Sequence, residues 1–103
     1  MSILLEFSMF PTDKGSSVSD EVSKVIDMIR NEGVSYRLTA MGTIIETETM
    51  EEALAVVQKS YDILSNDADR IYSSLKIDAR SGKTGRLSGK IESIEGKIGK
   101  ADT

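Results

Sequence analysis

The chain has 103 residues, enough for one domain, and its 39% hydrophobic and 29% charged residues are ordinary for a soluble globular protein. Its net charge of −4 argues against a nucleic-acid binder, which needs a basic face, and is compatible with a cationic ligand. Cysteine and histidine are absent, which excludes disulfides, thiolate metal sites, thiol nucleophiles and the commonest general base.

Neither a targeting segment nor a membrane span is predicted. Residues 1–10 lack the basic start of a signal peptide and carry Glu6 inside their apolar run. No segment has the length of apolar sequence that a bilayer requires. We therefore expect a cytoplasmic protein that contacts neither membrane nor nucleic acid.

The first predicted element is a strand over residues 2–10, because apolar residues take every second position there. Its expected buried face comprises Ile3, Leu5, Phe7 and Met9. Pro11 is expected to end the strand, because proline has no N–H for a ladder. The composition of residues 12–17 predicts a loop.

A helix is predicted next, because a stripe of apolar residues recurs at helical spacing. The stripe comprises Val18, Val22, Val25, Ile26 and Ile29. Ser17 or Ser19 is expected to cap its first turn. Gly33 is expected to follow the last turn in the left-handed conformation.

Residues 34–48 predict a β-hairpin whose turn lies at Met41 and Gly42. A two-residue loop at that place puts Arg37 opposite Glu46. The expected core face of the hairpin comprises Tyr36, Leu38, Ala40, Thr43, Ile45 and Thr47.

A second helix and a fourth strand complete the predicted order. Thr49 and Glu52 have the spacing of a capping box, which opens a helix. Its expected buried side comprises Ala53, Leu54, Val57, Tyr61 and Leu64. Residues 71–80 alternate again, so a strand with one buried face is expected.

The order β-α-β-β-α-β predicts a ferredoxin-like α+β sandwich, with both helices on one face of a four-stranded antiparallel sheet. We assign this domain to residues 1–80. The other sheet face is too apolar to be an ordinary solvated surface, so we expect it to pack against a second subunit. Residues 81–103 form a tail with a short helix, whose glycines weaken it and which needs a docking surface on the domain or on a neighbouring subunit.

Several polar residues are candidates for contact with a ligand. Glu46 could bind a cation or accept a hydrogen bond from an amino group; the alternative is a cross-strand ion pair with Arg37. Ser8 and Ser17 flank the first loop and could hydrogen-bond a ligand, although the sequence alone favours Ser17 as a helix cap. Thr43 is either a ligand contact or an ordinary strand residue. No phosphate loop, EF-hand or zinc motif is present.

Two blocks of sequence, Met41-Gly42-Thr43-x-x-Glu46 and Lys76-Ile77-Asp78-x-Arg80, together resemble the thiamine-binding, YkoF-like family. The resemblance implies a ferredoxin-like fold and assembly into dimers or tetramers through the sheets. It also implies binding of thiamine, or of its hydroxymethylpyrimidine part, as a ligand rather than a cofactor, and no catalysis. Family members often carry glycine after the motif glutamate, where this chain has Thr47.

The sequence thus predicts an oligomeric, non-catalytic binder of thiamine or a related pyrimidine, without a metal. The partner is a second copy of the chain, joined through the sheet faces and the C-terminal helix as a homodimer or homotetramer. The expected ligand-binding residues are Ser8, Ser17, Met41, Thr43 and Glu46. The alternatives are a regulatory or structural interaction module without its own ligand, and an enzyme that uses Glu46 or Lys76.

Overall fold

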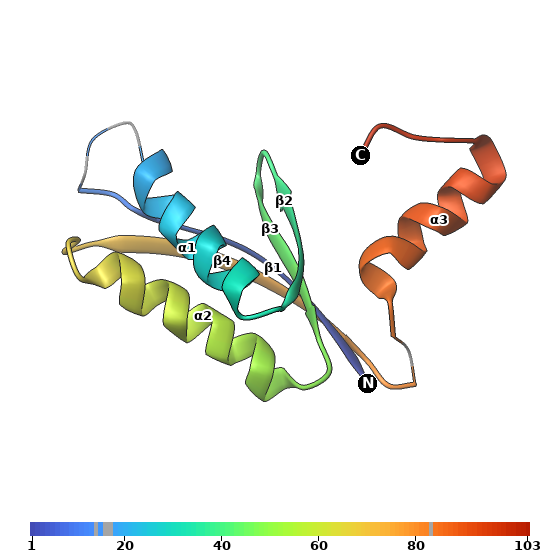
Figure 1. Ribbon diagram of the computed structural model, residues 1–103, viewed down its shortest axis with the longest axis horizontal. Coiled ribbons are helices and arrows are strands. Elements are labelled where there is room, and N and C mark those ends of the chain that lie inside the picture. The colour runs from blue at the N-terminus through green and yellow to red at the C-terminus, as the bar shows by residue number, and fades with distance from the viewer. Residues whose placement is uncertain (14, 16–17, 83) are drawn as a thin grey trace.

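A computed structural model describes residues 1–13, 15, 18–82 and 84–103 of the chain (Figure 1). The strands and helices are β1 (Ser2–Pro11), α1 (Ser19–Asn31), β2 (Ser35–Thr39), β3 (Gly42–Thr47), α2 (Met50–Ser65), β4 (Ile71–Arg80) and α3 (Arg86–Ile98). The sheet is antiparallel with strand order β2-β3-β1-β4. The predicted ferredoxin-like fold is confirmed.

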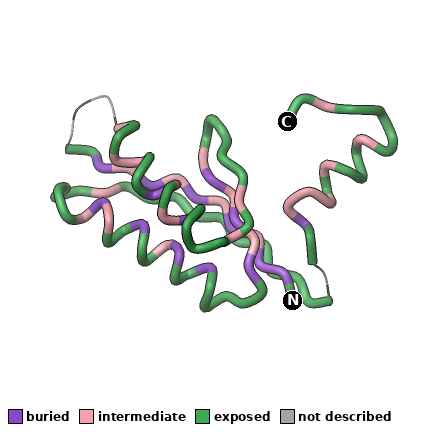
Figure 2. The backbone as a smooth tube through the Cα atoms, viewed as in Figure 1, coloured by how far each residue is buried: buried purple, intermediate pink, exposed green. Residues whose placement is uncertain are grey.

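The core lies between one face of the sheet and helices α1 and α2 (Figure 2). The alternation predicted for β1 is confirmed, since its buried residues are Ile3, Leu5, Phe7 and Met9. Val25 and Ile29 of α1 and Ile45 of β3 close the same core. The central strand is therefore fixed by apolar burial on its helix-facing side.

The strand β1 is one residue longer than predicted, because Pro11 pairs with Ile71 of β4. The ladder between β1 and β3 ends at Phe7 and Thr43, so residues 8–11 pair with β4 alone. A strand directs its backbone groups to alternate sides, and the Phe7 carbonyl faces Gly42 of β3. The nitrogen of Pro11 faces that same, unpaired side, where a missing N–H costs no ladder bond.

The predicted register of the hairpin is wrong by two residues. The turn consists of Ala40 and Met41, and Gly42 already pairs with Thr39. The Thr39 hydroxyl fixes this turn, because it accepts hydrogen bonds from the backbone N–H groups of Met41 (3.2 Å) and Gly42 (3.1 Å). A shift of two residues keeps every side chain on its predicted face but changes every cross-strand partner.

Three of the predicted helix caps fall on described residues, and two of these predictions are confirmed. Gly33 has φ 73°, as predicted for the residue after α1. Thr49 caps α2, accepting from the backbone N–H of Glu52 at 3.1 Å. The N-cap of α1 is Val18, so the prediction of Ser19 as a cap is wrong, and Ser17 lies outside the described residues.

The predicted buried face of α2 is partly wrong. Its buried residues are Ala53, Val56, Ser60 and Leu64. Leu54 and Tyr61, both predicted to be buried, are 46% and 48% exposed. Small side chains face the sheet and allow close packing, and the Ser60 hydroxyl donates to the Val56 carbonyl (2.8 Å), so its burial leaves no unsatisfied group.

The buried face predicted for β4 is absent in the single chain. Ile71 is half-buried and the other residues of β4 are exposed. β4 is an edge strand of the sheet, and its helix-facing residues Leu75 and Ile77 are 39% and 43% exposed. Alternation correctly predicted the strand but could not show that α1 and α2 stop short of covering it.

The helix α3 lies apart from α1 and α2 and contacts β1, β2 and β3 (Figure 1). Leu87 and Ile91 are half-buried, whereas Ile94 and Ile98 are 53% and 75% exposed. Only the first part of the predicted apolar stripe is therefore docked on the chain's own sheet. In the described part of the chain, no helix has both the length and the apolarity to cross a bilayer.

Candidate functional site

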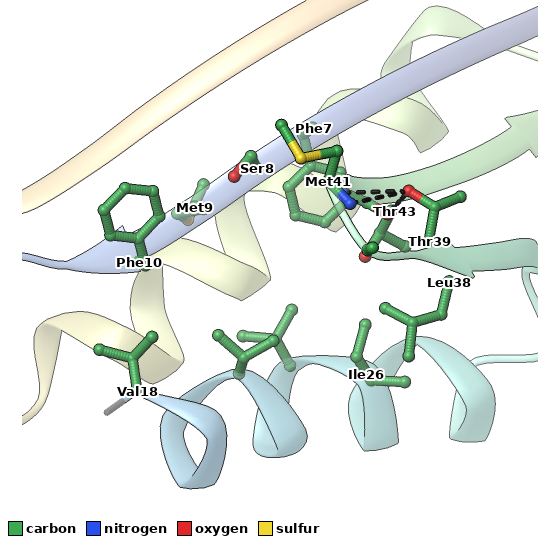
Figure 3. A pocket seen from close by; sticks show the side chains of 14 residues that line it. Phe7, Ser8, Met9, Phe10, Val18, Ile26, Leu38, Thr39, Met41 and Thr43 are labelled. Carbon is green, nitrogen blue, oxygen red and sulfur yellow. Dashed lines mark hydrogen bonds between the residues drawn. The ribbon is translucent and has the colours of Figure 1, made fainter. Parts of the chain in front are cut away.

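A cavity of about 180 Å³ lies where the turn of the hairpin meets the second half of β1 and the first half of α1 (Figure 3). It is lined by residues 7–10 and 38–43 and by Val18, Val22, Val25 and Ile26. The walls are mainly apolar, with Phe7 and Met9 from β1 and Val22 and Ile26 from α1. The cavity exists because β1 continues past the hairpin, which leaves a gap beside its last residues.

Three of the predicted site residues line this cavity: Ser8, Met41 and Thr43. Met41 lies at the tip of the hairpin and is 85% exposed, whereas Thr43 is buried at 5%. Ser17 lies outside the described residues, although the adjacent Val18 is part of the lining. Glu46 is not among the lining residues.

The backbone of β1 adds hydrogen-bonding groups to the cavity. Residues 8–11 have no ladder on the β3 side. The Phe7 carbonyl faces Gly42, and alternation directs the N–H and C=O of Met9 to the same side. Sequence reasoning missed these groups and the apolar wall from α1; the available signal was that the first strand is longer than either strand of the hairpin.

Gly42 allows the hairpin to approach β1 at the edge of the cavity. A Cβ added at Gly42 would lie 2.9 Å from the Phe7 carbonyl oxygen, closer than real Cβ atoms come. The glycine predicted to be a turn residue is therefore required for a close approach of two strands. It sets the position of Thr43, which follows it in the cavity wall.

Glu46 takes part in a separate cluster at the other end of β3. Its Oε2 accepts hydrogen bonds from the Ser2 hydroxyl and from the backbone N–H of Arg86 (3.0 Å), and its Oε1 accepts from the backbone N–H of Leu87 (3.0 Å). The predicted cross-strand pair with Arg37 is wrong, because the register places Ile44 opposite Arg37 and Ser35 opposite Glu46. The carboxylate caps the first turn of α3, where the helix dipole favours negative charge.

The hydrogen bonds to Glu46 decide its charge state. Burial of the carboxylate raises its pKa, but the hydrogen bonds from Ser2, Arg86 and Leu87 and the Arg86 charge outweigh burial. The net result is a pKa of Glu46 below its ordinary value, so the carboxylate is ionised at neutral pH.

Arg86 is the buried charge at the centre of this cluster, 6% exposed. Its Nε donates to the Ser2 hydroxyl (3.0 Å), its Nη2 donates to the carbonyls of Ser2 (2.7 Å) and Asp78 (2.6 Å), and its Nη1 donates to Asp78 Oδ2 (2.9 Å). Hydrogen bonding to Lys90 is the main cause that lowers the pKa of Asp78, and burial only partly opposes it; the Arg86 charge lowers it further. Sequence reasoning missed Arg86, which sits in a glycine-rich stretch directly before the apolar stripe of α3.

Glu46 also lines a second, more open cavity of about 490 Å³. Three further carboxylate residues line this second cavity: Glu32, Glu48 and Glu52. Glu32 forms an ion pair with Lys59, and Glu52 accepts from the Thr49 hydroxyl at 3.0 Å. The predicted site residues thus fall into two places: three hydroxyl or thioether side chains at the first cavity and one carboxylate at the second.

Comparison with known proteins agrees with the fold and with the resemblance found in the sequence. The sequence profile described as "Thiamine-binding protein" matches residues 5–95. A UPF0045 protein of Mycobacterium bovis is 34% identical over 95 residues, which is 92% of this chain and 93% of that protein. A UPF0045 protein of Methanocaldococcus jannaschii is 35% identical over 92 residues, covering 89% of this chain and 91% of that protein.

Solved structures show the same architecture. The crystal structure of a hypothetical protein from Methanocaldococcus jannaschii superimposes with a TM-score of 0.80 at 34% identity, covering 90% of this chain and 95% of that one. A Thermotoga maritima protein, named provisionally for thiamine biosynthesis or salvage, superimposes with a TM-score of 0.78 at 20% identity, covering 91% of this chain and 99% of that one.

Proposed function

Because the chain belongs to the thiamine-binding protein family, we propose that it binds the aminopyrimidine part of thiamine, or hydroxymethylpyrimidine itself, in the cavity between the hairpin turn, β1 and α1. The observation that carries this proposal is a small, mainly apolar cavity whose lining includes Ser8, Thr43 and a stretch of β1 that has no partner strand on the β3 side. Such a site combines apolar walls with a few placed polar groups, as ligand sites do.

The size of the cavity favours a single ring. Pockets for drug-sized ligands usually measure roughly 300–1,000 Å³, whereas this cavity measures about 180 Å³. A pyrimidine ring would fill it, and the second ring of thiamine would lie outside, beside the exposed Met41. We therefore expect hydroxymethylpyrimidine to retain most of the affinity of thiamine.

The lining residues favour binding over catalysis. Among the residues that the structure describes, those that line the cavity carry hydroxyl, thioether and hydrocarbon side chains, without a carboxylate or an amine. These described side chains can hydrogen-bond a ring nitrogen and an amino group, but they are not general acids or bases. We propose a protein that holds its ligand unchanged.

Self-association through the open face of the sheet and α3 is part of the proposal. Leu4 and Ile44 are half-buried on that face and line a shallow hollow together with Lys76 and Asp78. Ile94 and Ile98 of α3 are also exposed. Burying these side chains against a second copy in a homodimer or homotetramer would remove apolar surface from water. The same surface would serve an interaction module without a ligand, which remains the second candidate.

Isothermal titration with hydroxymethylpyrimidine and with thiamine tests ligand binding directly. Thr43→Val keeps the shape of the side chain and removes its hydroxyl, so it should weaken binding roughly tenfold. Ser8→Ala should weaken binding less, and Val22→Phe should abolish it by filling the cavity.

Matched controls separate the cavity from the rest of the sheet. The first control is Ser74→Ala, because Ser74 of β4 lies directly opposite Ser8. The second is Thr47→Val, because Thr47 lies on the same face of β3 as Thr43. Neither Ser74 nor Thr47 lines the cavity. Both should leave the affinity unchanged. Absence of heat at millimolar concentrations of both ligands, with folded protein, would rule out the pyrimidine proposal and leave the interaction module.

A further inference from the structure

Glu6 is a carboxylate on the open face of the sheet. It is half-buried there, since its neighbours Leu5 and Phe7 are buried on the helix-facing side of β1. Lys76 lies opposite it on β4. Among the described residues, however, neither an ion pair nor a side-chain hydrogen bond involves Glu6. Its negative charge is therefore available to a cation from outside the chain.

The side chain of Glu6 lies beside the end of the hairpin that borders the first cavity. Its Cγ would be 3.8 Å from a Cβ added at Gly42, which is one of the lining residues. Ser8, another lining residue, follows Glu6 on the same face of β1, about 7 Å further along the strand. A ligand that leaves the cavity past Ser8 therefore meets the carboxylate of Glu6.

The first cavity reaches the open face of the sheet around the free edge of β1. Its lining includes Phe7 and Met9, which face the helices, and also Ser8 and Phe10, which face away from them. Figure 3 shows the Phe10 ring and the Met41 side chain on the side of the cavity opposite α1. Both faces of β1 contribute because this part of the strand has no partner on the β3 side.

An aromatic pair lies beyond Ser8, on the side away from Glu6. Phe10 and Tyr72 are directly opposite each other on β1 and β4, and their ring centroids are 5.8 Å apart at an interplanar angle of 42°. Phe10 lines the cavity, whereas Tyr72 does not and is 57% exposed. The faces of aromatic rings attract cations. Ser8 is thus flanked along the strand by two groups that each favour positive charge.

Thiamine consists of a neutral aminopyrimidine ring, a single methylene bridge and a cationic thiazolium ring. We propose that the thiazolium ring lies over Ser8 on the open face, between the Glu6 carboxylate and the pair of Phe10 and Tyr72, when the aminopyrimidine ring occupies the cavity. This inference rests on the proposed function and assigns a place to the second half of the ligand. It makes the protein prefer thiamine to hydroxymethylpyrimidine, which is neutral and lacks the second ring.

Glu6 supplies a carboxylate that Glu46 cannot supply. Both carboxylate oxygens of Glu46 already accept hydrogen bonds, from Ser2 and from the first turn of α3. A partly exposed carboxylate gains only a modest amount from a cation, so the preference for thiamine should be about threefold to fivefold. Hydroxymethylpyrimidine then still retains most of the binding free energy.

Isothermal titration with thiamine and with hydroxymethylpyrimidine tests the inference. In Glu6→Gln, the affinity for thiamine should fall about threefold to fivefold, whereas the affinity for hydroxymethylpyrimidine should stay unchanged. Tyr72→Leu should give the same pattern, because Tyr72 lies outside the cavity. Added salt should weaken the binding of thiamine to the wild type more than to Glu6→Gln.

Two matched controls make the same changes at exposed positions away from the first cavity: Glu48→Gln and Tyr61→Leu. Both should bind the two ligands as the wild type does. An unchanged affinity for thiamine in folded Glu6→Gln, or an equal loss for both ligands, would overturn this inference and leave the proposed function standing. A wild type that binds neither ligand would overturn both.

Discussion

At the scale of single residues, a cluster of buried and half-buried hydrogen bonds holds the start of α3 against the sheet. The buried Arg86 donates five hydrogen bonds. Four come from its guanidinium group and go to Ser2 and Asp78, and one comes from its backbone N–H and goes to Glu46. A buried charge is tolerated only when its donors are satisfied, and the geometry here satisfies them. The cluster therefore fixes where the tail leaves the sheet.

Replacing Arg86 tests the strength of this attachment. Arg86→Met should lower the free energy of unfolding by about 2–3 kcal/mol, because it leaves the Ser2 carbonyl and part of the Asp78 backbone without a donor. Urea denaturation measures the change. Arg80→Met, at an exposed position, should stay within about 0.5 kcal/mol. Equal effects of the two substitutions would contradict the role assigned to Arg86.

The pKa of Glu46 predicts how the docking of α3 depends on pH. Its pKa is lowered in the folded protein from the ordinary value of 4.5, so the stabilisation is complete above that pH and is lost as the pH falls through the folded pKa. Hydrogen exchange at the amides of Arg86 and Leu87 should therefore accelerate, after correction for intrinsic rates, below about pH 4.5. In Glu46→Gln this acceleration should be reduced, since the titrating group is gone.

Gly42 is a residue whose substitution should disturb the candidate site. Gly42→Ala forces a Cβ against the Phe7 carbonyl at 2.9 Å, so we expect a loss of about 1–3 kcal/mol of stability and weaker ligand binding. Thermal unfolding and titration of the same sample measure both effects. A neutral result would show that the hairpin can move away from β1 without cost.

At the scale of elements, the sequence predicted those whose signals are local. The strict alternation of β1 and the capping box at Thr49 identified a strand and a helix start without any tertiary information. The face of α2 was harder, because apolar residues populate two adjacent stripes and the smaller residues turned inward. Hydrophobicity alone does not decide between such stripes; the fit against the sheet does.

The candidate site also has a part that the sequence predicted and a part that it did not. The residues Ser8, Met41 and Thr43 come together because the fold alone places the hairpin tip beside the end of β1. The partners of Glu46 depend on the hairpin register and on a helix that begins forty positions further along the chain, and a local pattern contains neither. Long-range contacts of this kind cannot be predicted from the local patterns of a single sequence.

The helix α3 is a marginal element that two glycines weaken. A Cβ added at Gly89 or at Gly96 would have no atom within 4 Å outside the helix's own backbone. Gly89→Ala and Gly96→Ala should therefore each stabilise the helix by about 1 kcal/mol. Hydrogen exchange within α3 measures the gain. Gly99→Ala provides the contrast, because its φ of 89° strains any other residue and should bring no gain.

At the scale of the whole molecule, the cavity and α3 are separate. Within the described ranges of the chain, the residues that line the first cavity come from β1, α1 and the hairpin with its neighbouring positions, and not from α3. We propose that residues 1–80 fold as an independent domain, so a chain ending there should keep its sheet and its affinity for hydroxymethylpyrimidine while losing stability. Circular dichroism and titration check both points. Loss of binding in a folded truncated chain would show that α3 contributes to the site.

The buried guanidinium of Arg86 joins positions that lie 84 residues apart. During synthesis on the ribosome, β1, β3 and β4 all emerge before α3. Until α3 emerges, the Arg86 guanidinium is missing from the cluster, and water must hydrate the polar groups of Ser2, Glu46 and Asp78. Docking of α3 is therefore a late event of synthesis: the Glu46 carboxylate is hydrated until the first turn of α3 emerges, and it then accepts hydrogen bonds from the backbone of Arg86 and Leu87.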